Sequence, residues 1–245
     1  MNKYYGLIIS FIAGISTLIG YFFIYIKGDK EKIISYSLSF SGGVMITLSL
    51  VDLIPSSIKD LSMNNGIIKS ILICIVYFVI GFLVCIFIEK QFKKINNLYK
   101  TGLLSMIGII LHNIPEGIAT YVLSTINLKL GIMLSIAIVL HNIPEGICIA
   151  IPIYYSTNNK IKTFSYTFIS GISEFIGALL SMLILYKYIN NTMIGILFSI
   201  IAGIMIYIGY YELIKTAKKY NNSFSKFYSL FGSIFILIVE ILLKM

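Results

Sequence analysis

Eight long apolar segments divide this chain of 245 residues, and short groups of Lys, Asn and Gly residues separate them. A helix needs about 20 apolar residues to cross the hydrocarbon core of a bilayer, so each segment is long enough to span a membrane. The pattern predicts transmembrane helices at residues 4–26, 33–57, 66–89, 101–126, 128–155, 163–188, 192–214 and 225–243. Because eight spans use most of the chain, residues 1–245 are expected to form a single transmembrane domain.

The composition agrees with an all-α polytopic membrane protein. Hydrophobic residues make up 58% of the chain and charged residues only 12%, about half the charged share of soluble domains. The net charge of +9 comes from lysines beside the apolar segments. Such lysines attract anionic lipid headgroups, so we expect membrane lipids and no nucleic acid as partners.

Lysine placement predicts the orientation of the spans. Thirteen of the 19 lysines lie in the loops after the first, third, fifth and seventh segments, and six lie on the opposite side. The positive-inside rule therefore places these loops in the cytoplasm and both termini outside the cell. The first segment has no small-residue cleavage pattern after it, so we expect a retained helix and not a signal peptide.

Five of the ten acidic residues lie within the predicted spans, where a charge is costly. The other five, which include Glu89 and Glu240, lie in loops or at span ends, where solvation is expected. Each acid within a span costs roughly 2.5–3.5 kcal/mol at the centre of a membrane helix, and no lysine lies in the interior of a predicted span to offset it. Structural pairing could explain one or two, so an ion pathway is the stronger interpretation. The five acids within the spans are Asp52, Glu116, Glu145, Glu174 and Glu212.

The hexapeptide His-Asn-Ile-Pro-Glu-Gly occurs twice, at residues 112–117 and 141–146, and it contains both histidines of the chain. His and Glu are four residues apart in each copy and so share a helix face. A neutral imidazole and a carboxylate one turn apart suit a divalent metal, and the Asn side chains add carbonyl oxygens. The expected ligands are His112, Asn113, Glu116, His141, Asn142 and Glu145.

Proline provides a second indication of a polar cavity. Pro115 and Pro144 lack an amide hydrogen, which frees the carbonyl groups four residues earlier and kinks the helix. Pro55 likewise frees the carbonyl group of Val51, next to Asp52. Free carbonyl groups at membrane depth are tolerated only inside protein or beside a cavity. A single proline would indicate a packing kink, but three beside acids favour a pathway.

The sixth segment offers a further ligand. Glu174 lies in a stripe of small residues where a neighbouring helix can approach closely, so it is expected to complete the metal site. The alternative is a protonated Glu174 that hydrogen-bonds a neighbouring helix. Asp52 and Glu212 lie nearer the span ends and are expected to line an entrance and an exit. Cys148 is expected to be a packing residue.

These motifs resemble the ZIP family of divalent-metal transporters, and in particular its short bacterial ZupT type. The resemblance covers essentially the whole chain: the two hexapeptides, the SGISE segment with Glu174, GGVMITLSLVDLIP in the second span and AGIMIYIGYYEL in the seventh. It implies a 3+2+3 arrangement of eight helices with inverted symmetry, and an elevator-type importer in the bacterial plasma membrane that can form homodimers.

The resemblance also implies a binuclear site. One metal would be held by His112, Glu116, His141 and Glu145. The other would be held by Asn113, Glu116, Asn142, Glu145 and Glu174, so that two glutamates bridge. The chain departs from the family in a short loop at 90–100 without a histidine-rich stretch, and in Phe175 and Lys215, which replace usual prolines.

Mixed imidazole, amide and carboxylate ligands without thiolate fit Zn²⁺, Fe²⁺, Mn²⁺, Co²⁺ and Cd²⁺ as transported ions and disfavour Cu(I). No catalytic cofactor is expected, because we expect a transporter and not an enzyme. Two alternatives remain open. An intramembrane metal-dependent hydrolase would also use His and Glu, but the HExxH motif is absent. A passive metal channel is excluded less firmly.

Overall fold

The computed structural model describes residues 4–92, 95–183, 190–221 and 223–244. Within these residues there is no β-strand, and eight helices are long and apolar enough to cross a membrane. The predicted fold class is confirmed: the chain is an all-α, multi-pass membrane protein.

Several spans contain more than one helical element. The first three spans are α1 (Tyr4–Ile15), α2 (Thr17–Tyr21) and the 3₁₀ turn η1 (Phe22–Tyr25); α3 (Lys30–Leu48), the π-helical segment η2 (Ser49–Leu53) and α4 (Ile54–Ser62); and α5 (Ile67–Gln91). The fourth and fifth spans are α6 (Asn97–Ile126) and α7 (Leu128–Thr157). The last three spans are α8 (Lys160–Leu183); α9 (Asn191–Tyr207), the π-helical segment η4 (Ile208–Ile214) and α10 (Lys215–Tyr220); and α11 (Ser225–Lys244).

The second and seventh spans are longer than hydropathy predicts. The second begins three residues before the expected residue 33, because Asp29 caps α3 by accepting from the backbone N–H groups of Glu31 and Lys32. The seventh continues to Tyr220, where polar turns extend beyond the apolar stretch. Hydropathy detects only the apolar part of such helices. The expected end of the sixth span at 188 lies outside the described residues.

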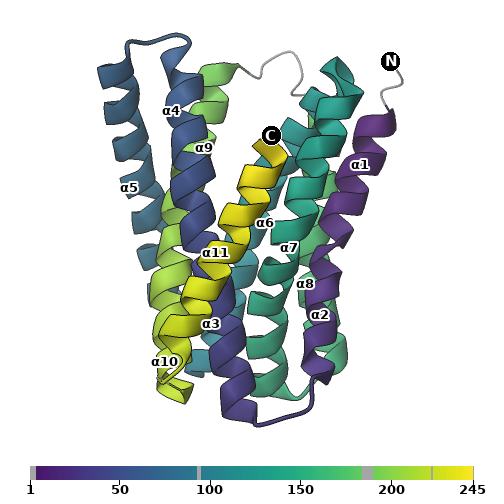
Figure 1. Ribbon diagram of the computed structural model, residues 1–245, viewed down its shortest axis with the longest axis vertical. Helices are drawn as coiled ribbons and strands as arrows, with labels where there is room; N and C mark the ends of the chain where they lie inside the picture. The colour runs from purple at the N-terminus through teal and green to yellow at the C-terminus, as the bar shows by residue number, and fades with distance from the viewer. Residues whose placement is uncertain (1–3, 93–94, 184–189, 222, 245) are drawn as a thin grey trace.

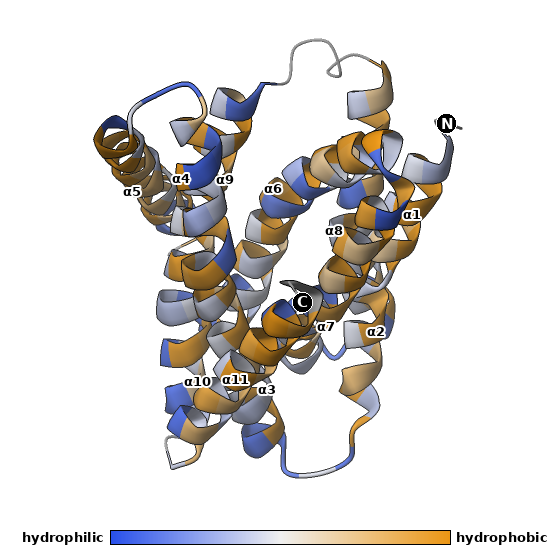
Figure 2. Cartoon of the chain, turned by 45° about the horizontal axis from the view of Figure 1, so that its top comes forward, coloured by the Kyte–Doolittle hydropathy of each residue, from blue (hydrophilic) through white to orange (hydrophobic). Residues whose placement is uncertain are grey.

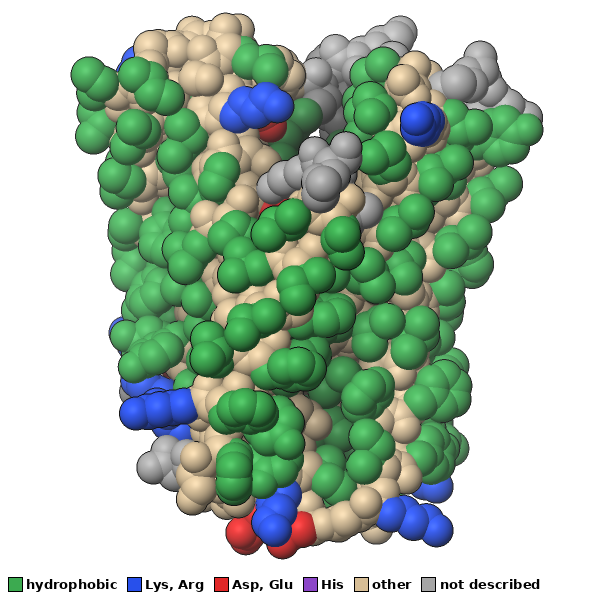
Figure 3. All heavy atoms as spheres, viewed as in Figure 1, with side chains coloured by type: hydrophobic (Ala, Val, Ile, Leu, Met, Phe, Trp, Pro, Cys, Tyr) green, Lys and Arg blue, Asp and Glu red, His purple; other side chains and the backbone are tan. Residues whose placement is uncertain are grey.

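Apolar side chains cover the outside of the bundle. Figure 2 shows hydrophobic residues along the length of the helices, and Figure 3 shows a mostly hydrophobic surface with most charged side chains towards the two ends. On α5 the exposed side chains include Ile68, Leu72 and Phe87, which are 74%, 59% and 67% exposed. This surface suits contact with lipid hydrocarbon.

The helices form a central group with paired helices beside it (Figure 1). In the central group α6 packs against α7 and α8, and α1 and α2 pack against α7 and α8. In the flanking pairs α3 packs along α11, and α5 packs along α9. The arrangement places the two hexapeptides, on α6 and α7, in the middle of the bundle.

Close backbone approaches at glycines show the inverted symmetry of the flanking pairs. A Cβ atom on Gly43 of α3 would overlap the carbonyl oxygen of Ser229 of α11. A Cβ atom on Gly203 of α9 would likewise overlap the carbonyl oxygen of Phe78 of α5. The α3–α11 contact therefore has its counterpart in the α9–α5 contact.

The reverse approaches have the same register. Gly81 of α5 meets the carbonyl oxygen of Ile200, and Gly232 of α11 meets that of Phe40. The second span thus corresponds to the seventh and the third to the eighth. Because consecutive spans alternate in direction, corresponding spans cross the membrane in opposite directions, as in inverted-repeat transporters.

The two π-helical segments occupy corresponding positions. Segment η2 contains Asp52, nine residues after Gly43, and η4 contains Glu212, nine residues after Gly203. A π-helical turn inserts one residue into the helix and redirects the side chains that follow, and such turns are frequent at functional sites. The same distortion therefore surrounds both predicted pathway acids.

Candidate metal site

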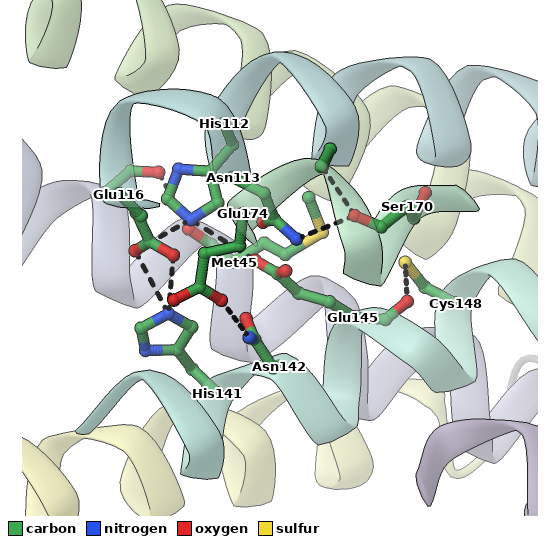
Figure 4. Close-up of polar contacts among 12 residues, drawn as sticks. Met45, His112, Asn113, Glu116, His141, Asn142, Glu145, Cys148, Ser170 and Glu174 are labelled. Atoms are coloured by element: carbon green, nitrogen blue, oxygen red, sulfur yellow. Dashed lines mark hydrogen bonds and ion pairs between the residues drawn. The ribbon is translucent and has the colours of Figure 1, made fainter. Parts of the chain in front are cut away.

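The two histidines meet at the carboxylate of Glu116 (Figure 4). Glu116 Oε1 lies 3.1 Å from His112 Nε2 and 3.1 Å from His141 Nε2. The ring centroids of the two histidines are 6.1 Å apart. One carboxylate from α6 therefore contacts an imidazole on each central helix.

Glu145 approaches the same group from α7. Its Oε1 atom lies 3.4 Å from His112 Nε2, and the side chain is buried. One donor atom each from His112, His141 and Glu145 lies within 4.8 Å of the others. Two ligands of one tetrahedral zinc ion lie about 3.4 Å apart, so small side-chain movements would bring these atoms into a common coordination sphere.

The two asparagines have equivalent roles in the two halves. Asn113 Nδ2 donates to the carbonyl oxygen of Ser170 at 3.1 Å, and Asn142 Nδ2 donates to the carbonyl oxygen of Ala13 at 2.9 Å. Because a backbone carbonyl can only accept, the side-chain atom that contacts it must be the amide nitrogen, and this contact fixes the orientation of each side-chain amide. Each Asn side-chain oxygen is thereby held as an acceptor.

Several of these buried acceptor atoms accept no hydrogen bond from the residues that the structure describes. A buried acceptor without a donor normally costs about 1–3 kcal/mol, so such atoms are rare and call for an explanation. Here they gather around one point between α6, α7 and α8. They are Asn113 Oδ1, Asn142 Oδ1, both carboxylate oxygens of Glu145, and Glu174 Oε1.

Glu174 joins this group from α8. Its Oε2 atom accepts from Asn142 Nδ2 at 3.0 Å, and the side chain is fully buried. The contact with Asn142 is also what the protonated alternative for Glu174 would show. Glu174 nevertheless points into the cluster of histidines and glutamates (Figure 4).

Gly117 and Gly146, the last residues of the hexapeptides, allow the neighbouring helices to come this close. A Cβ atom on Gly117 would overlap the carbonyl oxygen of Glu174, and one on Gly146 would overlap that of Thr17. Thr17 on α2 is therefore the counterpart of Glu174 on α8. Only one half of the inverted pair supplies an acid at this position, so the predicted ligand set is asymmetric.

The predicted pathway acids lie on η2 and η4, outside the two central helices that carry the hexapeptides. Asp52 is half-buried in η2 and accepts from Ser56 Oγ at 3.4 Å. Glu212 is buried in η4, where Lys100 Nζ lies 3.4 Å from its Oε1 atom and Thr101 donates to it. The expectation that no lysine offsets an intramembrane acid was therefore wrong for Glu212, because α6 begins earlier than predicted and includes Lys100.

Sequence reasoning also missed Glu89, which it assigned to solvent at a span end. Glu89 Oε1 accepts from Lys100 Nζ at 2.6 Å, and Glu89 Oε2 accepts from the Tyr207 hydroxyl. Lys100, Glu89 and Glu212 line a polar pocket of about 210 Å³ at the end of α5, α6 and η4. The sequence feature that could have indicated this cluster is the position of Lys100, twelve residues before His112.

The remaining notable residues lie outside this arrangement. Cys148 Sγ donates to its own helix at the Glu145 carbonyl, which fits a packing role. Phe175, in place of a usual proline, contacts the ring of Phe11 edge to face. Lys215, also in place of a proline, lies with its ammonium 3.9 Å from the ring centroid of Tyr211.

Comparisons with known proteins agree with the motifs. The family model described as ZIP Zinc transporter matches residues 89–240. The zinc transporter ZupT of Oceanobacillus iheyensis is 35% identical, over 99% of this chain and 98% of the relative. The zinc transporter ZupT of Clostridium perfringens is 33% identical, over 99% of this chain and 96% of the relative. That of Streptococcus mutans is 34% identical, over 96% of both chains.

Proposed function

We propose, because this chain belongs to the ZIP zinc transporter family, that it carries zinc and related divalent metal ions across a membrane through the site between α6, α7 and α8. The observation that supports this most directly is the group of buried acceptor atoms around the two histidines. A divalent cation would use these lone pairs and offset the glutamate charges.

The proposed site holds two ions. His112, Glu116, His141 and Glu145 bind one of them. The second binds to the asparagine oxygens and Glu174, with Glu116 and Glu145 bridging. The contacts of Glu116 with both imidazoles favour a bridging role for it, since one carboxylate already faces ligands on two helices. Nitrogen and oxygen ligands suit Zn²⁺ first, with Fe²⁺, Mn²⁺, Co²⁺ and Cd²⁺ as further substrates.

The proposed direction is import into the cytoplasm of a bacterial cell, across the plasma membrane and with both termini outside. Thirteen of 19 lysines on one side support this orientation. Metal then enters near Asp52 and leaves past Glu212, which lie on η2 and η4 in corresponding halves of the inverted fold. Lipids surround the bundle, and a homodimer is its proposed assembly.

Uptake of radioactive zinc into proteoliposomes tests this function. Glu116→Ala and Glu145→Ala are expected to abolish uptake at unchanged protein abundance, whereas the matched control Glu31→Ala, at an exposed position, is expected to retain it. Retained transport in both site variants would contradict the proposal. Competition by Fe²⁺, Mn²⁺, Co²⁺ and Cd²⁺ in the same vesicles ranks the substrates.

The same vesicles distinguish a carrier from a channel. Unlabelled zinc inside the vesicles should accelerate the entry of labelled zinc in a carrier, because a loaded site returns faster than an empty one. Unaffected flux would favour a passive channel. An intramembrane hydrolase would need an activated water on the metal. Protein-dependent cleavage of peptide substrates by the zinc-loaded protein would favour that alternative.

A further inference from the structure

The inverted symmetry of the fold relates the Lys100 cluster to a second set of charged residues. Lys100 lies twelve residues before His112, and Lys129 lies twelve residues before His141. Both lysines lie in the first turn of a central helix, Lys100 on α6 and Lys129 on α7. The antiparallel hairpin of α6 and α7 places them at opposite ends of the bundle.

The acids repeat in the same register. Glu89 lies eight residues after Gly81, and Glu240 lies eight residues after Gly232. These two glycines have corresponding close approaches on α5 and α11. Together with the matched pair of Asp52 and Glu212, the set of Lys100, Glu89 and Glu212 at one end therefore has a counterpart at the other: Lys129, Glu240 and Asp52.

The set that contains Lys100 is assembled in this conformation. Its ammonium lies 2.6 Å from Glu89 and 3.4 Å from Glu212, and these side chains are 16%, 32% and 4% exposed. The contacts join α6 of the central group to α5 and η4 of the flanking pair. This set of contacts therefore joins the two groups of helices at the end where the loops after the first, third, fifth and seventh spans lie.

The counterpart lysine has a different environment. Lys129 is exposed, and among the residues that the structure describes it forms no ion pair. The two ends of an otherwise symmetric bundle thus differ in whether the lysine of the central group contacts the acids of the flanking pair.

We propose that Lys100 and Lys129 are alternating latches, each closing one end of the transport pathway by binding the acids of the flanking helices. In this conformation Lys100 closes the end with Glu89 and Glu212. In the opposite conformation Lys100 releases these acids, and Lys129 binds Glu240 and Asp52. Each lysine also supplies a tethered cation at acids that passing metal would meet. The role of the latches rests on the proposed transport function, but the experiment that tests them does not require transport.

Cysteine labelling measures which end is open without any transport. Thr216 is buried beside the Lys100 pocket, and Ser56 is its counterpart, because each lies thirteen residues after the matched Gly203 or Gly43. Thr216→Cys and Ser56→Cys serve as reporters in a background with the three native cysteines replaced by alanine. Each reporter variant also carries Glu116→Ala and is labelled with an impermeant maleimide in metal-free vesicles. Under these conditions the test does not depend on metal binding.

Lys100→Met is expected to raise the labelling rate at Thr216→Cys roughly tenfold and to lower the rate at Ser56→Cys. A change of this order of magnitude is expected when two partly buried ion pairs are lost. Lys129→Met is expected to do the reverse. Glu89→Gln should act as Lys100→Met does, and Glu240→Gln as Lys129→Met does.

Lys219 lines the same pocket and forms no ion pair with another described residue, so Lys219→Met removes the same charge and should change labelling less than twofold. Lys100→Arg keeps the charge and should behave as the unchanged protein. If Lys100→Met fails to insert, the Lys129, Glu89 and Glu240 variants decide the question. Shifts of both reporters in the same direction in the two lysine variants, or changes below twofold, would overturn the proposal.

Discussion

Replacement of Asn142 by leucine should destabilise the protein more than the same replacement of Asn113, although the two residues occupy equivalent positions. Asn142 Nδ2 donates to two buried acceptors, the Ala13 carbonyl at 2.9 Å and Glu174 Oε2 at 3.0 Å. Asn113 Nδ2 donates only to the Ser170 carbonyl, at 3.1 Å.

Leucine has a similar size but cannot donate. The Ala13 carbonyl keeps the N–H and hydroxyl of Ser16 as donors. The Ser170 carbonyl keeps the Ser173 hydroxyl. Only Glu174 Oε2 therefore loses its donor, and it does so in Asn142→Leu alone.

Each buried acceptor left without a donor costs about 1–3 kcal/mol. Asn142→Leu leaves one such acceptor, Glu174 Oε2, and is expected to lower the free energy of unfolding by about 1–3 kcal/mol. Asn113→Leu leaves none and is expected to lower it only by the net worth of one hydrogen bond, about 0.5–1.5 kcal/mol. Reversible unfolding by SDS in mixed micelles, without added metal, measures both values. Metal must be absent because both variants also lose a proposed ligand oxygen.

The double variant Asn142→Leu with Glu174→Leu provides the control. It removes the carboxylate together with its donor, so it should recover part of the loss, since replacing both partners by apolar groups is nearly neutral. Equal destabilisation by the two asparagine variants, or a double variant less stable than Asn142→Leu alone, would refute the reasoning.

Three further predictions concern packing and charge. Gly117→Ala and Gly146→Ala should each cost about 1–3 kcal/mol of stability in the same SDS assay, because the added Cβ meets a backbone carbonyl, whereas Gly66→Ala has open space and should be close to neutral. The three cysteines are buried and free, so the native protein should react with maleimide only after unfolding; rapid labelling of the native state would contradict the described packing. Zinc binding should release protons, because three glutamates and two histidines share one buried site; a pH indicator dye that records no release near the titration range of the ligands would contradict this.

Hydropathy was sufficient to predict the number and approximate location of the spans, because lipid requires long apolar helices in which every backbone group is paired. The ends of the second and seventh spans were misjudged for the same reason. The second span begins with a polar turn that Asp29 caps, and the seventh ends in the polar turns of α10, neither of which an apolar window detects. The π-helical segments also left no recognised signal in the sequence.

The placement of His and Glu on one face of each central helix could be predicted, because residues four apart share a helix face in any α-helix. The structure shows the contact of His112 with Glu116 that this spacing predicts, and the packing of α6 on α7 adds His141 and Glu145 to the same group. The stripe of small residues singled out Glu174, but the helix that it packs on, at Gly117 of α6, is known only from the structure. The ion pairs of Lys100 depend on contacts between distant parts of the chain, and no local pattern predicts those.

X-ray absorption at the zinc edge of the purified, zinc-loaded protein tests the central claim most directly. The account predicts nitrogen and oxygen ligands at about 2.0–2.2 Å with an imidazole signature, and loss of that signature in the double variant His112→Gln with His141→Gln. Cys148 lies close to the site, with its sulfur 3.1 Å from the Glu145 carbonyl, so a thiolate site would be distinguishable. A sulfur ligand at about 2.3 Å, or an unchanged spectrum in the double variant, would contradict the assignment.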